Sequence, residues 1–418
     1  MKTQRKKPHR KKSANSVFFE KINSWFLFLF ILLLPTQLGR HFFFPFSYLS
    51  GVRVDYLAPT IFLTDILVVI LIVLNIKAVL RLFKNKWVAA FLLLLAIGGL
   101  MAQSPEIFFY RFLKIIELLG VFAVFRYKKM PLKTILNAFF WGALFETGLV
   151  LLQFIDKHSI QGIFYFFGER YLNLSMPGIA KASLQGVEFL RPYGTFSHPN
   201  SLAGFYLLVY AFFYGQQKIQ SPFIKKALLT LSFIIILFSF SKTALIAFFI
   251  ILIFYLKDEF EDSECLPCII SKVVLYAVPI VIFALAKTDP STLEKRYLLL
   301  QISLTLISQH LLFGVGPGNY LIAQSQLSNS SPASFPYQPV HNIFLLIAAE
   351  TGLISTLFLG FFGLKQLVAA RKDLVFIACC IVLILTGLLD HYWLTLQQNW
   401  LLIGVIFGVL AAGRESTE

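Results

Sequence analysis

The sequence is poor in charged residues. Only 14% of its 418 residues are Asp, Glu, Lys or Arg, whereas a soluble globular protein carries about 25%. Hydrophobic residues make up 57% of the chain, and Phe alone occurs 46 times. Together with repeated apolar runs of about 20 residues, this deficit excludes an ordinary soluble protein and predicts an all-α, polytopic integral membrane protein. Strands are not expected, because an open sheet edge cannot be hydrogen bonded within hydrocarbon.

Cysteine is scarce, with four residues in the whole chain. Cys265 and Cys268 have the spacing of a metal site, but no second pair and no histidine cluster completes it. We therefore expect two ordinary cysteines in a cytoplasmic loop rather than a zinc or redox centre.

Acidic residues are also few, 21 against 37 Lys and Arg, which leaves a net charge of +16. Such an excess can mark a nucleic-acid partner, but the positive residues here lie mostly in short segments between apolar runs. That distribution sets membrane topology and does not form a binding face. With the N-terminus in the cytoplasm, 25 of the 37 Lys and Arg residues fall in cytoplasmic segments and 10 outside. Both termini are therefore predicted to be cytoplasmic.

About twelve transmembrane helices are predicted. The apolar run 224–256 is too long for one span, and Ser239–Thr243 interrupts it, so it is divided into a tight hairpin. The predicted spans are 22–36, 57–76, 87–103, 107–125, 133–155, 200–215, 224–240, 243–256, 272–286, 342–364, 373–390 and 394–412.

These spans define the organisation of the chain. A basic cytoplasmic N-terminus occupies 1–21, a single transmembrane domain 22–412, and a cytoplasmic tail 413–418. Two long extracytoplasmic loops result, at 156–199 and 287–341. They hold most of the outer positive charge, which opposes the topology rule. We therefore expect an anionic partner on that side of the membrane.

The first candidate motif is Arg191-Pro-Tyr-Gly-Thr-Phe-Ser-His-Pro-Asn200, just before the sixth span. Pro199, Asn200 and Ser201 are typical of a helix start, with Asn200 or Ser201 able to cap the free amides. A planar guanidinium beside a helix N-terminus suits phosphate oxygens. The alternative is an arginine that reaches the lipid headgroups next to a capped helix.

Two further cations lie in the predicted outer segments. Lys242 stands at the tip of the hairpin, where it can meet a pyrophosphate or a lipid phosphate. Arg296 lies near the start of Ser291–Leu312, which has the polar spacing of an amphipathic helix lying in the interface. The glycine-rich stretch Gly314–Asn319 lacks the lysine and the strand–helix setting of a phosphate loop. It is predicted to be a tight turn that ends this helix.

His341 opens the tenth span. An imidazole titrates near neutral pH, so His341 can take a proton from an attacking hydroxyl; the alternative is an interfacial histidine that bonds a neighbour. Glu350 lies about 14 Å deeper and on roughly the opposite side of the helix. It is therefore a poor partner for His341 and needs another partner within the bundle. Asp390, at the end of the eleventh span, is placed to orient a cation.

Four of these motifs, in this order, resemble the O-antigen ligase and O-antigen polymerase family of bacterial envelope glycosyltransferases. They are Arg191–Asn200, Ser239–Thr243, Gly314–Asn319 and His341-Asn342 with Glu350-Thr351-Gly352, and the resemblance covers about residues 185–355. It implies a protein of the bacterial plasma membrane that moves a glycan from undecaprenyl diphosphate to an acceptor hydroxyl on the extracytoplasmic face. The reaction implied belongs to cell-surface polysaccharide biosynthesis and uses no cofactor, metal or ATP.

The resemblance also implies roles for individual residues. His341 matches the catalytic histidine, while Arg191, Arg296 and Lys242 match cations that bind the diphosphate. The supporting residues implied are His198, Asn200, Asn342 and Glu350. Relatives often carry Arg at the hairpin position, so Lys242 departs from the pattern and lacks the bidentate geometry of a guanidinium.

Other functions fit the same layout. Twelve spans with both termini inside are common in transporters, so a transporter or a flippase of lipid-linked oligosaccharides is the alternative, as is a structural partner in a polysaccharide assembly complex. The sequence shows no two-fold internal repeat, which speaks against a transporter. Ligases, polymerases and protein-glycosylating enzymes share these motifs, so the sugar and the acceptor, whether glycan, lipid or protein, stay open.

Overall fold

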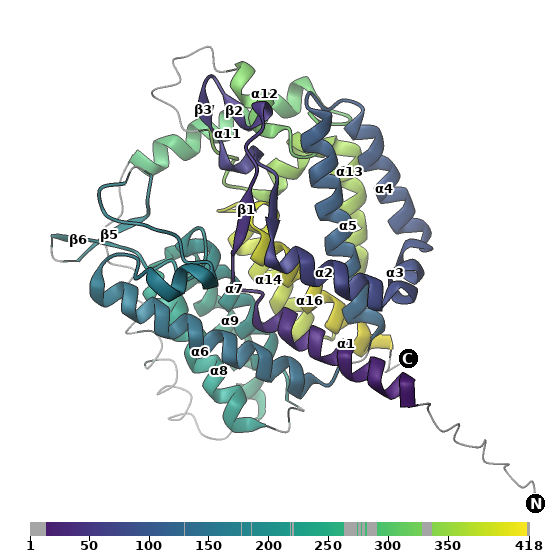
Figure 1. The fold of residues 1–418 in the computed structure, drawn as a ribbon, viewed down its shortest axis with the longest axis vertical. Helices are drawn as coiled ribbons and strands as arrows, with labels where there is room; N and C mark the ends of the chain where they lie inside the picture. Colours follow the sequence, from purple (N-terminus) through teal and green to yellow (C-terminus); the bar gives the residue numbers. More distant parts are fainter. Residues whose placement is uncertain are drawn as a thin grey trace, which may run out of the picture.

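The protein is described here from a computed structural model, which covers residues 14–128, 130–176, 178–184, 186–217, 219, 221–262, 274, 277, 281, 291–327 and 337–415. Its helices are α1 (Ala14–Leu32), α2 (Leu63–Leu74), α3 (Ile76–Phe83), α4 (Lys86–Gly99), α5 (Pro105–Tyr127), α6 (Leu132–Asp156), α7 (Pro199–Tyr214), α8 (Pro222–Phe238), α9 (Lys242–Asp262), α11 (Ser291–Gln309), α12 (Tyr320–Leu327), α13 (Ile343–Ala369), α14 (Leu374–Gly387), α15 (Tyr392–Thr395) and α16 (Gln397–Glu415). The prediction of a mostly helical protein is confirmed (Figure 1).

Every predicted span overlaps a helix except 272–286, which lies mostly outside the described residues. The prediction for 57–76 is wrong at its start, because Thr60–Phe62 is a strand and the helix begins at Leu63. Among the described helices, α6 and α13 are long and apolar enough to cross a membrane. A third span results if α2 and α3, which meet at an angle of 86°, are one broken span. The number of twelve spans, the orientation and the domain limits therefore stay predictions. The hairpin formed by α8 and α9 and the helix starting at Ser291 are confirmed.

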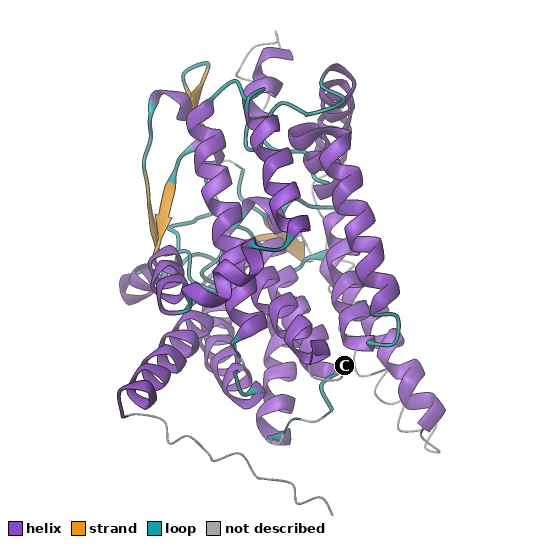
Figure 2. Cartoon of the chain, turned by 90° about the vertical axis from the view of Figure 1, so that its right-hand side faces the viewer, coloured by secondary structure: helices purple, strands orange, loops and turns teal. Residues whose placement is uncertain are grey.

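Strands are present, although none was expected. They form three two-stranded antiparallel sheets, visible as the short orange elements of Figure 2. The pairs are β1 (Gly39–His41) with β4 (Thr60–Phe62), β2 (Tyr48–Leu49) with β3 (Val52–Arg53), and β5 (Lys181–Leu184) with β6 (Val187–Leu190). All lie in segments between the apolar helices. Open sheet edges are excluded only inside hydrocarbon, and outside it water can form hydrogen bonds with them.

Helix α7 lies in the interior of the helix bundle (Figure 1). All residues of Leu202–Phe213 are buried, because α8, α9, α14 and α16 surround the helix. A helix that is apolar all round is expected at such a buried position. Its N-terminus, which follows the Arg191–Asn200 motif, is fixed by this packing.

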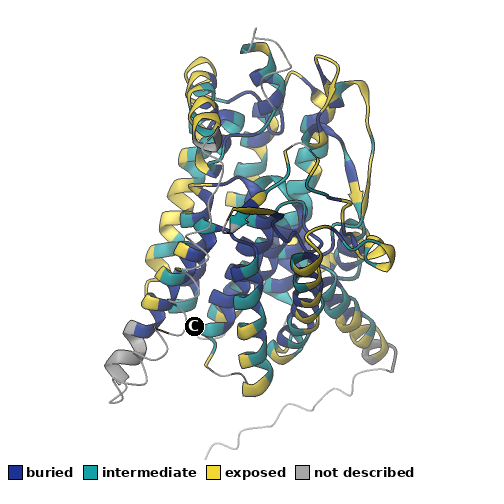
Figure 3. Ribbon diagram, turned by 90° about the vertical axis from the view of Figure 1, so that its left-hand side faces the viewer, coloured by how far each residue is buried: buried dark blue, intermediate teal, exposed yellow. Residues whose placement is uncertain are grey.

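Many residues on the outward faces of the long helices are exposed, and Figure 3 colours these faces yellow. Large apolar side chains are frequent among them. Examples from α2, α4 and α13 are Val73, Leu93 and Leu357, which are 65%, 62% and 69% exposed. Exposed apolar surface of this extent is unfavourable in water. It is the surface of a protein that contacts lipid.

Helix α13 is interrupted at Gly352, whose φ of 72° and ψ of 173° are not helical. The loop after α11 fills the break: the amide of Gly316 donates to the carbonyl of Glu350 (2.9 Å), and that of Leu353 donates to the carbonyl of Leu311 (2.8 Å). Gly314 also has a positive φ, of 71°. The predicted tight turn is confirmed, and it packs directly against the Glu350-Thr351-Gly352 motif.

Candidate functional site

The start of α13 fixes the position of His341. Asn342 is the N-cap of this helix, and its side-chain oxygen accepts the amides of Phe344 (2.9 Å) and Leu345 (3.0 Å). Its side-chain nitrogen donates to the carbonyl of Leu388 at 3.2 Å, which joins the start of α13 to the end of α14. His341 is thereby held just outside the helix, next to the segment that follows α14.

Asp390 lies in that segment and faces His341. The Nδ1 atom of His341 is 3.5 Å from Oδ1 of Asp390, which is longer than an ordinary hydrogen bond but within ion-pair distance. The same oxygen accepts the amide of His391 at 2.8 Å. Nδ1 of His341 therefore faces the carboxylate, and Nε2 is the ring nitrogen that does not.

His391 forms a second imidazole beside the first. The two rings are 5.0 Å apart, and Nδ1 of His391 pairs with the hydroxyl of Thr395 at 2.8 Å. Burial lowers the pKa of His391 to about 3, although the nearby Asp390 acts in the opposite direction. His391 is therefore neutral at physiological pH.

An unbroken chain of contacts leads from Asp390 to Arg191. The side-chain nitrogen of Asn200 donates to Oδ2 of Asp390 at 2.9 Å, and Nη2 of Arg191 donates to Oδ1 of Asn200 at 2.7 Å. Nε of Arg191 donates to the carbonyl of Ser239 in the α8–α9 turn at 2.9 Å. Three segments that are far apart in the sequence therefore meet around one carboxylate.

Charge within this group is set by burial and by neighbours. Burial alone would raise the pKa of Asp390, but the facing imidazole of His341 and the nearby His391 and His198 hold that pKa well below its ordinary value. Burial lowers the pKa of Arg191 to about 10, so the guanidinium is still positively charged at neutral pH. The group thus holds one carboxylate and one guanidinium, linked through Asn200.

The cap of α7 differs from the prediction. His198, rather than Asn200 or Ser201, is the N-cap, and its Nδ1 accepts the amide of Asn200 at 3.1 Å. The two predicted caps are engaged elsewhere: Asn200 bonds Arg191 and Asp390. The hydroxyl of Ser201 donates to Asn399. Burial lowers the pKa of His198 to about 4, which keeps Nδ1 free to accept.

Polar side chains of α6 hold the motif loop before α7. Oε1 of Gln153 accepts the amides of Tyr193 (2.9 Å) and Gly194 (2.8 Å). Glu146 accepts the amide of Thr195 at 3.1 Å and also its hydroxyl. Glu146 and Gln153 are seven residues apart, which places them on one face of the helix. No motif in the sequence pointed to Glu146 and Gln153, although two polar residues at this spacing in an apolar run were a usable signal.

Arg296 and Lys242 lie around the same group. Nε of Arg296 is buried and has no hydrogen-bond partner among the described residues. After the larger effect of burial, its charge is among the influences that lower the pKa of His198 and His391. Lys242 begins α9, directly after the turn that accepts from Arg191. The side-chain nitrogen of Lys242 makes no ion pair or hydrogen bond with any described residue.

Glu350 is not part of this group. Its carboxylate bonds the backbone amides of Gly318 and Tyr320 in the glycine-rich loop and interacts with Arg111. The partner that the sequence analysis required for Glu350 is therefore this loop. Its support is structural, because it holds the loop in the break of α13.

Tyr56 reaches the group from the segment before α2. Its ring meets that of His391 edge to face at 5.6 Å. Burial and the nearby Asp390 raise the pKa of Tyr56 to about 12, so the hydroxyl stays protonated. No motif pointed to Tyr56, because aromatic residues are frequent throughout this chain.

Three of these side chains could hold a metal ion. Ligand atoms of His341, Asp390 and His391 lie within 4.8 Å of one another, and two imidazoles with one carboxylate suit zinc and similar ions. Several of their polar atoms are already bonded: Asp390 accepts from Asn200, and His391 pairs with Thr395. The expectation of a metal-independent reaction stays a prediction.

Comparison with known protein families gives a match for part of the chain. Residues 227–360 match the family described as O-antigen ligase. The match includes Ser239–Thr243, Gly314–Asn319 and His341–Gly352, while Arg191–Asn200 precedes it. A search among curated proteins finds no match. The resemblance to the O-antigen ligase and polymerase family is thus confirmed over residues 227–360, and the long apolar helices are those of a membrane protein.

Proposed function

We propose that the protein is a glycosyltransferase that moves a glycan from undecaprenyl diphosphate to an acceptor hydroxyl at the extracytoplasmic face of the bacterial plasma membrane. The observation that carries this proposal is the chain of contacts from Arg191 through Asn200 and Asp390 to His341. It gathers a base, the carboxylate that orients the base, and a cation at one place. Both termini then lie in the cytoplasm, and the product enters cell-surface polysaccharide.

His341 acts as the general base. Asp390 faces Nδ1 and favours the tautomer that carries its proton there, so that the lone pair of Nε2 is free. The side chain of His341 is 23% exposed, which leaves room for an acceptor hydroxyl. Nε2 takes the hydroxyl proton while the oxygen attacks the anomeric carbon of the donor. The neutral His391 beside it adds no competing positive charge.

The bond between the anomeric carbon and the phosphate oxygen breaks, and its electron pair leaves with the diphosphate. Arg296 and Lys242, which have no described partners, are the cations free to contact the departing oxygens. Arg191 is 8% exposed and already bonds Ser239 and Asn200. Its part is to add positive charge at short range and to hold the α8–α9 turn, so that Lys242 is correctly placed. The energy of the donor bond drives transfer, and neither a metal nor ATP is required.

The direct test uses purified protein in nanodiscs, an undecaprenyl-diphosphate-linked glycan and candidate acceptors, with EDTA present and ATP absent. Transfer to an acceptor supports the proposal, and its dependence on an added metal would overturn the metal-independent mechanism. His341→Ala should abolish transfer without changing the thermal unfolding midpoint. His310→Ala is the matched control, because this exposed histidine directly follows the helix that carries Arg296.

The same preparation separates an enzyme from a transporter. Reconstituted in vesicles, a flippase would move the lipid-linked glycan between leaflets without transferring it, and His341→Ala would leave that movement unchanged. Retained transfer by His341→Ala would remove the proposed base. The choice of acceptor in a productive assay distinguishes ligase, polymerase and protein glycosylation.

A further inference from the structure

A cavity of about 410 Å³ lies between α4, α5, α13 and α16. Its walls are mostly aliphatic and aromatic, and they include Leu95, Ile115, Ile347, Phe358 and Leu359. The α13 residues in this wall lie on both sides of the break at Gly352, from Ile347 before it to Leu359 after it, so the cavity follows much of that helix. An apolar cavity of this length within a membrane protein suits a hydrocarbon chain rather than a compact polar ligand.

Arg111, on α5, lines this cavity. No acidic side chain of the described residues lies within ion-pair distance of its guanidinium, and Glu350, which interacts with it, is already bonded to the amides of Gly318 and Tyr320. An arginine within an apolar helix is costly unless its charge is matched. Arg111 thus lines the cavity with Glu350 as a longer-range neighbour and without a close ion pair among the described residues, so its guanidinium can bond an anion in the cavity.

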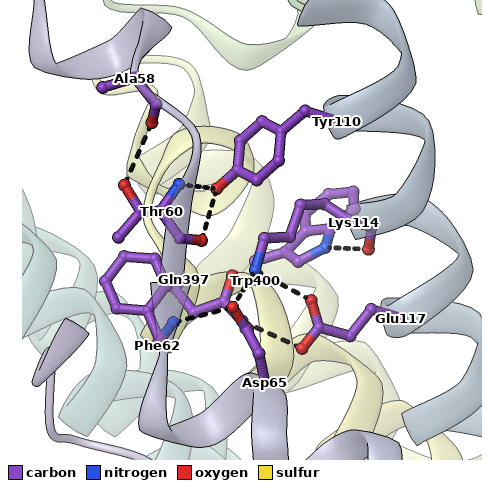
Figure 4. A network of polar contacts seen from close by, with 9 residues as sticks. All are labelled: Ala58, Thr60, Phe62, Asp65, Tyr110, Lys114, Glu117, Gln397 and Trp400. Carbon is purple, nitrogen blue, oxygen red and sulfur yellow. Dashed lines mark hydrogen bonds and ion pairs between the residues drawn. The ribbon is translucent and has the colours of Figure 1, made fainter. Parts of the chain in front are cut away.

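Lys114, one turn further along α5, provides the contrast. Its Nζ lies 2.6 Å from Asp65 and 3.2 Å from Glu117. Gln397 of α16 donates to both carboxylates, and Figure 4 shows these four side chains converging from α2, α5 and α16. The charge of Lys114 is thus fully matched, and this network closes the polar wall of the cavity. Arg111 is the cation left to meet a ligand.

The cavity begins beside the candidate site. Thr395 lines it, and the hydroxyl of Thr395 pairs with Nδ1 of His391. The positive charge of Arg111 is near enough to Tyr56 to act against the increase in the pKa of its hydroxyl. The ring of Tyr56 contacts His391. A ligand can therefore place its chain in the cavity and its anionic end next to His341 at the same time.

We propose that this cavity holds the isoprenoid chain of the lipid-linked donor, with Arg111 bonding the phosphate nearest the chain. The assignment rests on the proposed function. Apolar walls stabilise the chain by excluding water from it, and the guanidinium fork matches two phosphate oxygens. In this arrangement Arg111 approaches the diphosphate from the chain side, and Arg296 and Lys242 approach it from the sugar side.

The test is equilibrium binding of glycan-free undecaprenyl diphosphate and of geranyl diphosphate, which has the same head group and a short chain. Leu359→Trp fills the cavity and should weaken undecaprenyl diphosphate binding about 10-fold or more while leaving geranyl diphosphate nearly unchanged. Leu357→Trp, on the lipid-exposed side of the same helix, should alter neither. Arg111→Gln should weaken both ligands about 10-fold or more, as expected for the loss of a charge-assisted hydrogen bond.

Equal undecaprenyl diphosphate binding by Leu359→Trp and the unchanged protein would overturn the cavity assignment. If Leu359→Trp does not fold, Ile347→Phe replaces it, with the same expected loss. Unchanged binding by Arg111→Gln would overturn the phosphate contact. These measurements need neither glycan nor acceptor: a protein that binds in this chain-dependent way but transfers nothing would refute the proposed function and leave the cavity assignment standing.

Discussion

Gly352 in α13 faces the carbonyl oxygen of Leu312 so closely that a Cβ atom built on the glycine would lie 2.1 Å from that oxygen. The reverse relationship also holds, because a Cβ on Gly314 would lie 2.4 Å from the backbone carbon of Glu350. Two motifs that looked independent in the sequence are thus one structural unit. They place α11, and with it Arg296, against the helix that begins beside His341.

Substitution of Gly352 should therefore destabilise the protein. Gly352→Ala puts a Cβ against backbone atoms that cannot move aside, at a positive φ that alanine adopts poorly. We expect a loss of about 2–4 kcal/mol in the free energy of unfolding. Gly360→Ala is the control, because that glycine lies in the same helix with open space around its Cβ position. Similar thermal unfolding midpoints for the two variants would contradict this account of the break.

Asp390→Asn should lower transfer without preventing folding. The variant removes the negative charge that orients and stabilises the proposed base, so we expect kcat to fall about 10- to 100-fold with little change in KM for the donor. If Asp390 acts through His341, the double variant with His341→Ala should be no slower than His341→Ala alone. Additive losses would show that Asp390 has a separate role. The measurement is the initial rate of glycan transfer.

Gln153→Leu should loosen the Arg191–Asn200 motif. Its side-chain oxygen accepts two buried amides, which leucine would leave unpaired at a cost of about 2–4 kcal/mol. Thermal unfolding measures the loss, and transfer should fall with it because Arg191 is no longer fixed. Trp141→Leu is the control, since Trp141 is 54% exposed on the same helix. Equal stability of the two variants would count against the role of Gln153.

Much of this arrangement could be predicted from the sequence because hydropathy reports it directly. The helix positions and the α8–α9 hairpin follow from apolar runs and their interruptions. The resemblance implied that Arg191 and the hairpin residue Lys242 bind the same diphosphate, but not the hydrogen bond from Arg191 to the hairpin turn. The contacts that link Arg191 through Asn200 to Asp390 depend on packing between segments 190 residues apart. No local pattern in a single sequence reports such packing.

The parts that could not be predicted have three separate causes. Aromatic and polar residues recur throughout the chain, so Tyr56 and Gln153 carry no distinctive local signal. The cap of α7 was mispredicted because Asn200 is a good cap by propensity, yet Arg191 and Asp390 compete for its side chain. The short strands were overlooked because an argument about hydrocarbon does not apply to the segments between the helices.

Stability should depend on pH through His198. Burial holds its folded-state pKa at about 4, against 6.5 in the unfolded chain. Between these values the unfolded chain binds more protons, so the free energy of unfolding falls as the pH is lowered from about 6.5 to about 4. His198→Asn keeps a capping side chain without the titration, and its unfolding midpoint should fall less steeply in this window. An unchanged slope would assign the effect to other groups.

The two cations on one face of α5 should respond in opposite ways to the same substitution. Lys114→Met leaves Asp65 and Glu117 buried without their cation (Figure 4), which should destabilise the protein by about 3–5 kcal/mol. Arg111→Met removes a charge that no described carboxylate pairs within 4.0 Å, so stability should be unchanged or slightly higher in detergent without lipid. Adding undecaprenyl diphosphate should then raise the thermal unfolding midpoint of the unchanged protein more than that of Arg111→Met. Equal destabilisation by both substitutions would mean that Arg111 is matched within the protein and does not await a ligand.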